Sequence, residues 1–216
     1  MNLNPEIVTV LGYPMSLFEL IGTVASAYSV WLMGRLRITT WPVGIVGSAL
    51  FAILFYQIRL YGDFIEQIYY VGANIYGWIV WSRPHARQNE ITAFWSPPHV
   101  LALCAGGTLA ASVIFGWFLS QFHILMPTLF QAPAELPYLD GFTTMGSFVA
   151  MVLMAQKRTE SWIYWIVINI VSVGLYAVKD VFFIAILYGF YFVLALLGYR
   201  QWQEAGRKIL HHEALP

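Results

Sequence analysis

The chain has 216 residues, of which 59% are hydrophobic, 17% are aromatic and only 10% are charged. Soluble globular domains carry charge on about 25% of their residues, so this composition excludes a soluble domain and indicates a protein that crosses the membrane several times. Eleven basic residues balance eleven acidic ones, which removes the case for a nucleic-acid partner held by bulk charge.

The predicted elements begin with an N-terminal surface segment, residues 1–16. The stretch Ile7–Phe18 is apolar but too short to cross a bilayer, so we predict a surface helix there that leads into the first span. Seven later segments approach the length of about 20 apolar residues that a spanning helix needs. The alternating pattern of an outer-membrane barrel is absent from the sequence, so we predict an all-α integral membrane protein with seven transmembrane helices. In chain order the spans are Leu17–Gly34, Trp41–Tyr61, Phe64–Trp81, His99–Ser120, Gly141–Gln156, Trp162–Val178 and Val181–Tyr199.

The basic residues predict the orientation of these spans. Lysine and arginine collect in the cytoplasmic loops of membrane proteins. With the N-terminus outside, nine of the eleven basic residues fall on the inner side, and only Arg59 and Lys179 fall on the outer side. We therefore predict that the N-terminus is outside and that the C-terminus is cytoplasmic.

The chain resembles itself at an offset of 121 residues. This offset pairs Trp41 with Trp162 and Trp81 with Trp202 without a gap, among 13 identities over residues 19–81. Similar apolar helices could align by chance, but shared apolar composition does not readily match tryptophan, arginine, tyrosine and glycine in one register. Other identical pairs are Arg37 and Arg158, Ser26 and Ser147, Tyr70 and Tyr191, and Gly77 and Gly198.

Duplication of a three-helix unit explains this repeat. Three spans invert the chain, so a second copy inserts in the same orientation only if one additional helix crosses the membrane before it. We therefore predict two parallel three-helix repeats joined by a linker helix, a 3+1+3 order typical of transporters. The predicted units are the surface segment 1–16, the first repeat 17–82, a linker with the fourth transmembrane helix 83–138, the second repeat 139–202 and a cytoplasmic tail 203–216.

Polar and aromatic side chains line one face of the sixth predicted span. Trp162, Trp165, Asn169, Ser172 and Tyr176 recur at spacings of three and four residues, which places them on one side of a helix. Such a stripe is poorly suited to lipid, because an amide that faces hydrocarbon loses its hydrogen bonds. We predict that the stripe binds a substrate.

The third predicted span carries a matching stripe. Gln67, Tyr70, Asn74 and Trp78 follow one another at spacings of three, four and four residues. Amides in membrane bundles also bond neighbouring helices, for about 0.6 kcal/mol each, and this structural role stays open for them. Gln57 in the second span and Tyr188 in the seventh complete the predicted substrate-binding set.

Tryptophans near the ends of spans have an alternative role as anchors at the membrane interface. We expect that role for Trp41, Trp81, Trp95 and Trp202, and it stays open for Trp162 because this residue begins its predicted span.

The placement of charge restricts the ligand. Acidic residues lie toward the predicted outer ends of the spans, whereas a carrier driven by protons or sodium usually holds a carboxylate inside the membrane. No arginine or lysine lies in the middle of a span, so a phosphorylated ligand would find no charged clamp. We expect a flat ligand that bears amides or hydroxyls and is neutral or cationic, since aromatic faces favour cations. The acidic residues concerned are Glu19, Asp63, Glu66, Asp140 and Asp180.

Three motifs resemble the PnuC family of bacterial vitamin transporters. They are Phe55–Tyr61, Ala73–Trp78 and Trp162-x-x-Trp165-x-x-x-Asn169, and the resemblance extends from about Phe18 to Trp202. It implies the nicotinamide riboside branch of the family, a location in the bacterial inner membrane, a fold related to SWEET sugar transporters and a homotrimer. It also implies facilitated diffusion, with a cytoplasmic kinase that phosphorylates and traps the imported nucleoside. The substrate-binding residues that the resemblance implies are Trp162, Trp165, Asn169, Gln57, Gln67, Asn74 and Trp78.

Other functions stay open beside this one. Branches of the same family transport thiamine and riboflavin, and the shared motifs do not separate these vitamins. A retinal photoreceptor needs a lysine within its seventh span, and Val181–Tyr199 contains none. An enzyme, a metal site or a cofactor is not expected, because the five histidines lack metal-ligand spacing and Cys104 is the only cysteine.

Overall fold

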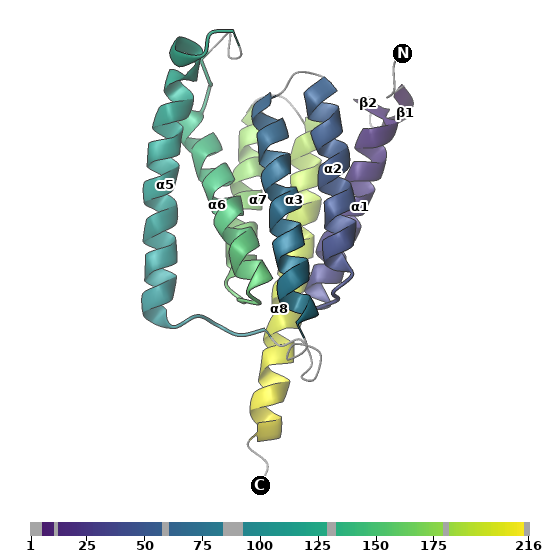
Figure 1. Ribbon diagram of the computed structural model, residues 1–216, viewed down its shortest axis with the longest axis vertical. Helices are drawn as coiled ribbons and strands as arrows, with labels where there is room; N and C mark the ends of the chain where they lie inside the picture. The colour runs from purple at the N-terminus through teal and green to yellow at the C-terminus, as the bar shows by residue number, and fades with distance from the viewer. Residues whose placement is uncertain are drawn as a thin grey trace.

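The computed structural model describes residues 6–10, 13–57, 61–83, 93–128, 133–178 and 182–213. Over these residues the chain forms seven α-helices and a small β-hairpin (Figure 1). All the helices except α3 are long and apolar enough to cross a membrane, so the chain is a helical integral membrane protein with a small N-terminal hairpin. The helices are α1 (Leu17–Gly34), α2 (Thr40–Gln57), α3 (Tyr61–Ser82), α5 (Pro98–Leu125), α6 (Pro137–Ala155), α7 (Ser161–Val178) and α8 (Phe182–Glu213).

The N-terminal hairpin contradicts the surface helix predicted over Ile7–Phe18. Strand β1 (Glu6–Val10) pairs antiparallel with strand β2 (Tyr13–Ser16). The β-branched residues of β1 favour a strand, and Pro14 in β2 disfavours a helix interior. The helix prediction rested on the length and apolarity of this stretch, which do not reflect either local preference.

Six helices form a closed ring. Contacts run from α1 to α2, α3, α6, α7 and α8 in that order, and α8 then packs on α1. The contacts between α3 and α6 and between α8 and α1 join the first half of the chain to the second. Helix α5 lies outside this ring and packs against α6 (Figure 1).

Several helix boundaries differ from the predicted spans: α2 ends at Gln57, α5 continues to Leu125 and α6 begins at Pro137. Helix α3 begins at Tyr61, so Asp63 lies inside a helix and not in a break between spans. Helix α8 continues to Glu213, beyond the predicted end of its span at Tyr199, because polar residues with good helix propensity follow there. The predicted break at Gly62–Asp63 falls inside α3, whereas the predicted break Lys179–Asp180 lies outside the described residues, as do Arg59 and Arg87.

Helices α1 and α6 end in the same hydrogen-bonded turn. Each is followed by a residue in the left-handed region, Leu36 with a φ of 54° and Lys157 with a φ of 62°. The backbone N–H groups of this residue and of the next one donate to carbonyls of the last helical turn at 2.9–3.1 Å, which is a Schellman motif. The two turns lie 121 positions apart, at the offset of the sequence repeat.

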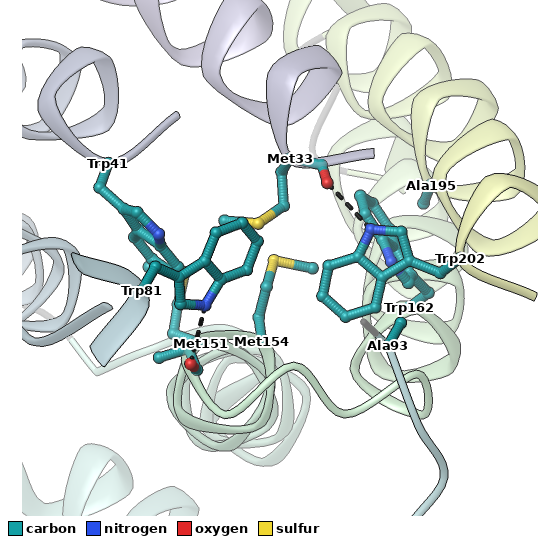
Figure 2. Packing of buried hydrophobic residues seen from close by; sticks show 10 residues of the cluster. Met33, Trp41, Trp81, Ala93, Met151, Met154, Trp162, Ala195 and Trp202 are labelled. Atoms are coloured by element: carbon teal, nitrogen blue, oxygen red, sulfur yellow. Dashed lines mark hydrogen bonds between the residues drawn. The ribbon is translucent and has the colours of Figure 1, made fainter. Parts of the chain in front are cut away.

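Four tryptophans, which we call the Trp cluster, fill the ring at the end where α1 and α6 terminate. Trp41, Trp81, Trp162 and Trp202 are each at most 1% exposed. Trp41 and Trp81 meet edge to face with ring centres 5.2 Å apart, and Trp162 and Trp202 do so at 5.6 Å. Figure 2 shows methionine side chains between the two pairs. The anchor role predicted for Trp41, Trp81 and Trp202 is therefore wrong, because these rings are core residues.

Two indole N–H groups of the Trp cluster bind one half of the chain to the other. The Trp81 Nε1 group on α3 donates to the Ala155 carbonyl at the end of α6 at 2.9 Å. The Trp202 Nε1 group on α8 donates to the Met33 carbonyl near the end of α1 at 2.9 Å (Figure 2). Both carbonyls lie in the last turn of a helix, where regular intrahelical partners are lacking, and the Met33 carbonyl also accepts from the Leu36 N–H at 3.0 Å.

The segment before α5 covers the α6–α7 turn at this end of the ring. The Phe94 N–H donates to the Lys157 carbonyl at 3.1 Å, and the Phe94 carbonyl accepts from the Thr159 N–H at 2.9 Å. The Glu160 carboxylate, which is 4% exposed, accepts from the Ser96 N–H at 3.2 Å. Residues 94–96, just before α5, are thereby fixed to the second half of the chain.

Two glycines allow the Trp cluster to pack. A Cβ atom at Gly77 would overlap the Trp41 ring, and a Cβ atom at Gly198 would overlap the Trp162 ring. We predict that Gly77→Ala lowers the free energy of unfolding by about 1–3 kcal/mol, as overpacking of a filled core does. Thermal unfolding of the purified protein in detergent measures this effect.

The matched control for this prediction is Gly72→Ala on the same helix. A Cβ atom at Gly72 has no neighbour within 4 Å, so we expect this variant to unfold at the parent temperature or slightly above it. Equal losses of stability in the two variants would show that the loss comes from helix α3 in general and not from the Trp cluster.

Candidate functional site

The stripe of residues predicted on the sixth span lies on α7 and faces the protein interior. Trp162, Asn169 and Ser172 are 1%, 4% and 2% exposed, and Trp165 is half-buried against the Trp cluster. Tyr176, near the other end of α7, is also half-buried. All five residues are therefore at least partly covered by protein and do not face lipid alone.

Asn169 stands out within this stripe. The residue is only 4% exposed and the described part of the chain offers its side chain no hydrogen-bond partner, although its amide nitrogen and oxygen are not fully shielded from solvent. Most buried polar side chains in proteins have such a partner, and each exception calls for an explanation. A ligand that bonds this amide would explain it.

On α3, Asn74 and Tyr70 lie inside the protein and contact neighbouring helices. The Asn74 amide is 6% exposed and donates to the Tyr70 carbonyl at 2.8 Å. A Cβ atom at Gly44 would overlap the Asn74 amide, so α2 approaches α3 closely there. The Tyr70 hydroxyl donates to the Ser147 Oγ on α6 at 2.7 Å. Gln67, one turn away on α3, is half-buried.

The two buried amides lie at the same depth. Asn74 precedes Trp81 of the Trp cluster by seven residues, and Asn169 follows Trp162 by seven residues. With a rise of 1.5 Å per residue, both amides lie about 10 Å from the Trp cluster along the ring. The same rise per residue places Tyr70 and Ser172 at one depth, about 15 Å from the Trp cluster along the ring.

Aromatic rings continue this interior away from the Trp cluster. Tyr176 of α7 stacks on Tyr188 of α8, with ring centres 5.4 Å apart and planes inclined by 13°. Tyr188 in turn meets Tyr191 edge to face at 6.5 Å. On the opposite half of the chain, Tyr69 of α3 stacks on Phe148 of α6 at 3.8 Å.

Three of the predicted site residues are placed differently from the rest. Gln57 is exposed at the last position of α2. Trp78 is 43% exposed and borders a surface pocket with Ile79, Ser82 and Arg83. Trp162 lies inside the Trp cluster, where its indole N–H has no partner among the described residues.

Sequence reasoning missed several residues of this interior. Ser147 and Phe148 of α6 and Tyr69 of α3 were not assigned to it, although they bond or stack with its members. The identity of Ser26 and Ser147 in the repeat was a usable signal for one of them. Phe148 and Tyr69 carry no such signal, because an aromatic residue in a span also suits a lipid-facing position.

The protein is a ring of membrane-spanning helices with buried amides and stacked phenols in its interior. One of these amides, Asn169, has no partner among the described residues. Such an interior is typical of a small-molecule transporter. Residues 16–204 match the protein family described as nicotinamide mononucleotide transporter. The chain belongs to this family. The family consists of transporters and not of enzymes, and the resemblance to PnuC inferred from the three motifs is confirmed.

Individual relatives agree with this assignment. The nicotinamide riboside transporter PnuC of Escherichia coli (strain K12) is 32% identical, with 93% of this chain and 92% of the relative covered. The riboflavin/roseoflavin transporter RibM of Streptomyces davaonensis is 25% identical, with 95% and 93% covered. A crystal structure of the vitamin B3 transporter PnuC matches with a TM-score of 0.63 and 26% identity, over 87% of this chain and 81% of that one.

The unpartnered amide leads to a prediction about stability. We expect Asn169→Leu to keep the free energy of unfolding of the parent, because the variant loses no hydrogen bond to the described residues. Tyr70→Phe is the comparison, since it removes the 2.7 Å bond to Ser147 and should cost about 1 kcal/mol. Thermal unfolding of both variants without ligand tests this. A loss in Asn169→Leu as large as in Tyr70→Phe would mean that the amide has a structural role.

Proposed function

We propose that this protein transports nicotinamide riboside through the ring of helices. The observation that carries the proposal is the pair of buried amides at one depth, Asn74 and Asn169, of which Asn169 has no partner among the described residues. Relatives named nicotinamide riboside transporters, which this chain matches over more than nine-tenths of its length, support the same substrate.

The chemistry of the interior suits this substrate. Nicotinamide riboside is a flat pyridinium cation with a carboxamide and a ribose. In our proposal the Trp165 ring stacks on the pyridinium, and Asn169 bonds the carboxamide. Ser172, Asn74 and Gln67 bond the ribose hydroxyls. Tyr70, Tyr176, Tyr188 and Trp162 complete the wall, while Gln57 and Trp78 stay sequence predictions outside this set.

The same interior disfavours a phosphorylated ligand. The interior residues named above are neutral, and a phosphate is usually bound by arginine, lysine or a helix N-terminus. Nicotinamide mononucleotide carries such a phosphate, so we propose the nucleoside and not the nucleotide as the cargo. Riboflavin is the second candidate, since RibM is a relative at 25% identity, and thiamine is a further alternative.

The proposed architecture has seven spans in a 3+1+3 order, with α3 as a span although its apolarity is low. The pairing of α1 with α8 and of α3 with α6 supports two like units, as do the matching turns after α1 and α6. The distribution of basic residues supports an outer N-terminus and a cytoplasmic C-terminus in the bacterial inner membrane. The Trp cluster then lies at the cytoplasmic end of the ring.

Flow through this ring is proposed to be passive. The amide level holds no carboxylate to couple transport to protons or sodium, so net uptake would rely on phosphorylation of the nucleoside by a cytoplasmic kinase. We also propose a homotrimer. The apolar and exposed outer face of α5, which includes Leu103 at 74% and Val113 at 61%, suits either lipid or a second copy of the chain.

The substrate is tested by a binding titration followed through tryptophan fluorescence. We expect the purified protein to bind nicotinamide riboside more tightly than thiamine, riboflavin or nicotinamide mononucleotide. Asn169→Leu and Trp165→Ala should each weaken binding by about 10- to 100-fold, through a lost hydrogen bond and lost stacking. Trp95→Ala, which alters a ring that is 44% exposed, is the control and should bind like the parent. Preference for riboflavin or thiamine would overturn the assignment of the substrate.

The mode of transport is tested in vesicles that contain only this protein. Uptake of labelled nicotinamide riboside should stop when its internal and external concentrations are equal, since no coupling group lies at the amide level. An imposed proton or sodium gradient should leave this end point unchanged. Accumulation above the external concentration in response to either gradient would contradict passive transport.

A further inference from the structure

Residues 94–96, which we call the strap, lie just before α5 and are bonded to the turn between α6 and α7. Phe94 pairs with Arg158 through two backbone hydrogen bonds to the residues on either side of it, in the manner of a parallel sheet. The Arg158 guanidinium also lies over the Phe94 ring, 4.3 Å from its centre. The Ser96 N–H donates to the Glu160 carboxylate at 3.2 Å. Three hydrogen bonds and a ring contact therefore join the strap to the turn.

The corresponding turn in the first half of the chain is held in another way. The Ser29 Oγ group on α1 donates to the Thr40 carbonyl at 2.9 Å, and the Thr40 Oγ1 group donates to the Ser29 carbonyl at 2.7 Å. These reciprocal bonds join α1 directly to the start of α2. Thr39, which corresponds to Glu160 at the repeat offset, is exposed, whereas Glu160 is 4% exposed.

The second half lacks this reciprocal pair of bonds. Ala150 stands at the position that corresponds to Ser29, and Ser161 stands at the position that corresponds to Thr40. The Ser161 Oγ atom is buried and has no hydrogen-bond partner among the described residues. The strap therefore supplies from outside the bonds that the first half makes between its own two helices.

Helix α7 begins directly after this turn and carries the residues of the proposed site. Trp165 and Asn169 follow Glu160 by five and nine residues, which is about 8 and 14 Å along the helix. The depth and rotation of α7 depend on where its first residues are held, and a shift there would displace both side chains. Glu160 itself is too far from Asn169 to touch a ligand that this amide bonds.

We propose that Glu160 is a positioning residue for the substrate site. Through its bond to the strap it holds the start of α7, and with it Trp165 and Asn169, in the place that the ligand requires. The proposal rests on the proposed function and deepens it. Without this bond α7 would sample other positions, and the measured affinity would fall in proportion to the fraction of molecules that keep the site in place.

The test measures both the affinity for nicotinamide riboside and the unfolding temperature of Glu160→Ala. This variant removes the acceptor of the Ser96 N–H, and we expect it to weaken binding about tenfold. Ser29→Ala is the matched control, because it removes buried hydrogen bonds at the same end of the ring but between α1 and α2, which carry no residue of the proposed site. We expect it to lower the unfolding temperature and yet to bind within about twofold of the parent.

The Trp95→Ala control for the substrate titration agrees with this account. The Trp95 ring meets Tyr199 of α8 edge to face, with ring centres 6.3 Å apart, and takes no part in the hydrogen bonds between the strap and the turn. Its removal leaves those bonds in place, so binding should stay like that of the parent.

A reversible cross-link tests the strap itself. Backbones paired as in a sheet lie about 4.8 Å apart, which suits a disulfide between positions 94 and 158. Phe94→Cys and Arg158→Cys are therefore added to Glu160→Ala, together with Cys104→Ser, which removes the only native cysteine. Oxidation fixes the strap to the turn and should restore the affinity to within about twofold of that of the Cys104→Ser protein, and reduction should weaken it again.

The outcomes are distinct. Binding like that of the parent by Glu160→Ala, with only its unfolding temperature lowered, would mean that Glu160 has a purely structural role, and the proposal would be wrong. Equal affinities of the oxidised and reduced cross-link variant, or equal weakening in Ser29→Ala, would also overturn it. If Glu160→Ala does not fold, Glu160→Gln, which keeps a weaker acceptor, replaces it in both comparisons. Failure of the parent protein to bind nicotinamide riboside would instead overturn the proposed function, and the role of Glu160 with it.

Discussion

Two hydrogen bonds from indole N–H groups, Trp81 to the Ala155 carbonyl and Trp202 to the Met33 carbonyl, hold the two halves of the ring together. Each lies where a helix of one half meets a helix of the other, and each is buried with its ring. Because a lost hydrogen bond of this kind leaves an unpaired group in a dry interior, both halves are held at a fixed relative depth. The positions of the other interior residues follow from the end of the ring that these two bonds hold.

The position of the Trp cluster determines the depth of the interior residues that lie farther along the ring. Asn74 and Asn169 come to one level because each lies seven residues from a tryptophan of the cluster, one before it and one after it. Hydroxyls follow one level farther away, and phenols follow beyond those. A ligand in this interior would meet amides, hydroxyls and aromatic faces in turn, which suits a polar molecule with a flat ring, a carboxamide and a ribose.

Much of this arrangement could be predicted from the sequence. Long apolar segments determine where helices form, and the ungapped match of Trp41 with Trp162 pointed to positions that share one local structure. The direction of a side chain was harder to predict, since Trp81 and Trp202 have the depth of interfacial anchors but point into the core. For the same reason Trp78 was grouped with Asn74, although it is 43% exposed. The hairpin at β1 and β2 was missed because apolarity alone does not separate a short helix from a strand.

The central claim is that the ligand lies between α3 and α7 at the level of the two amides. The most direct measurement is an experimental structure of the protein with nicotinamide riboside bound. The account predicts ligand density about 10 Å from the Trp cluster, with the Asn169 amide bonded to the carboxamide and the pyridinium stacked on Trp165. Ligand density in the surface pocket beside Trp78 and Arg83, with Asn169 still unpartnered, would contradict it.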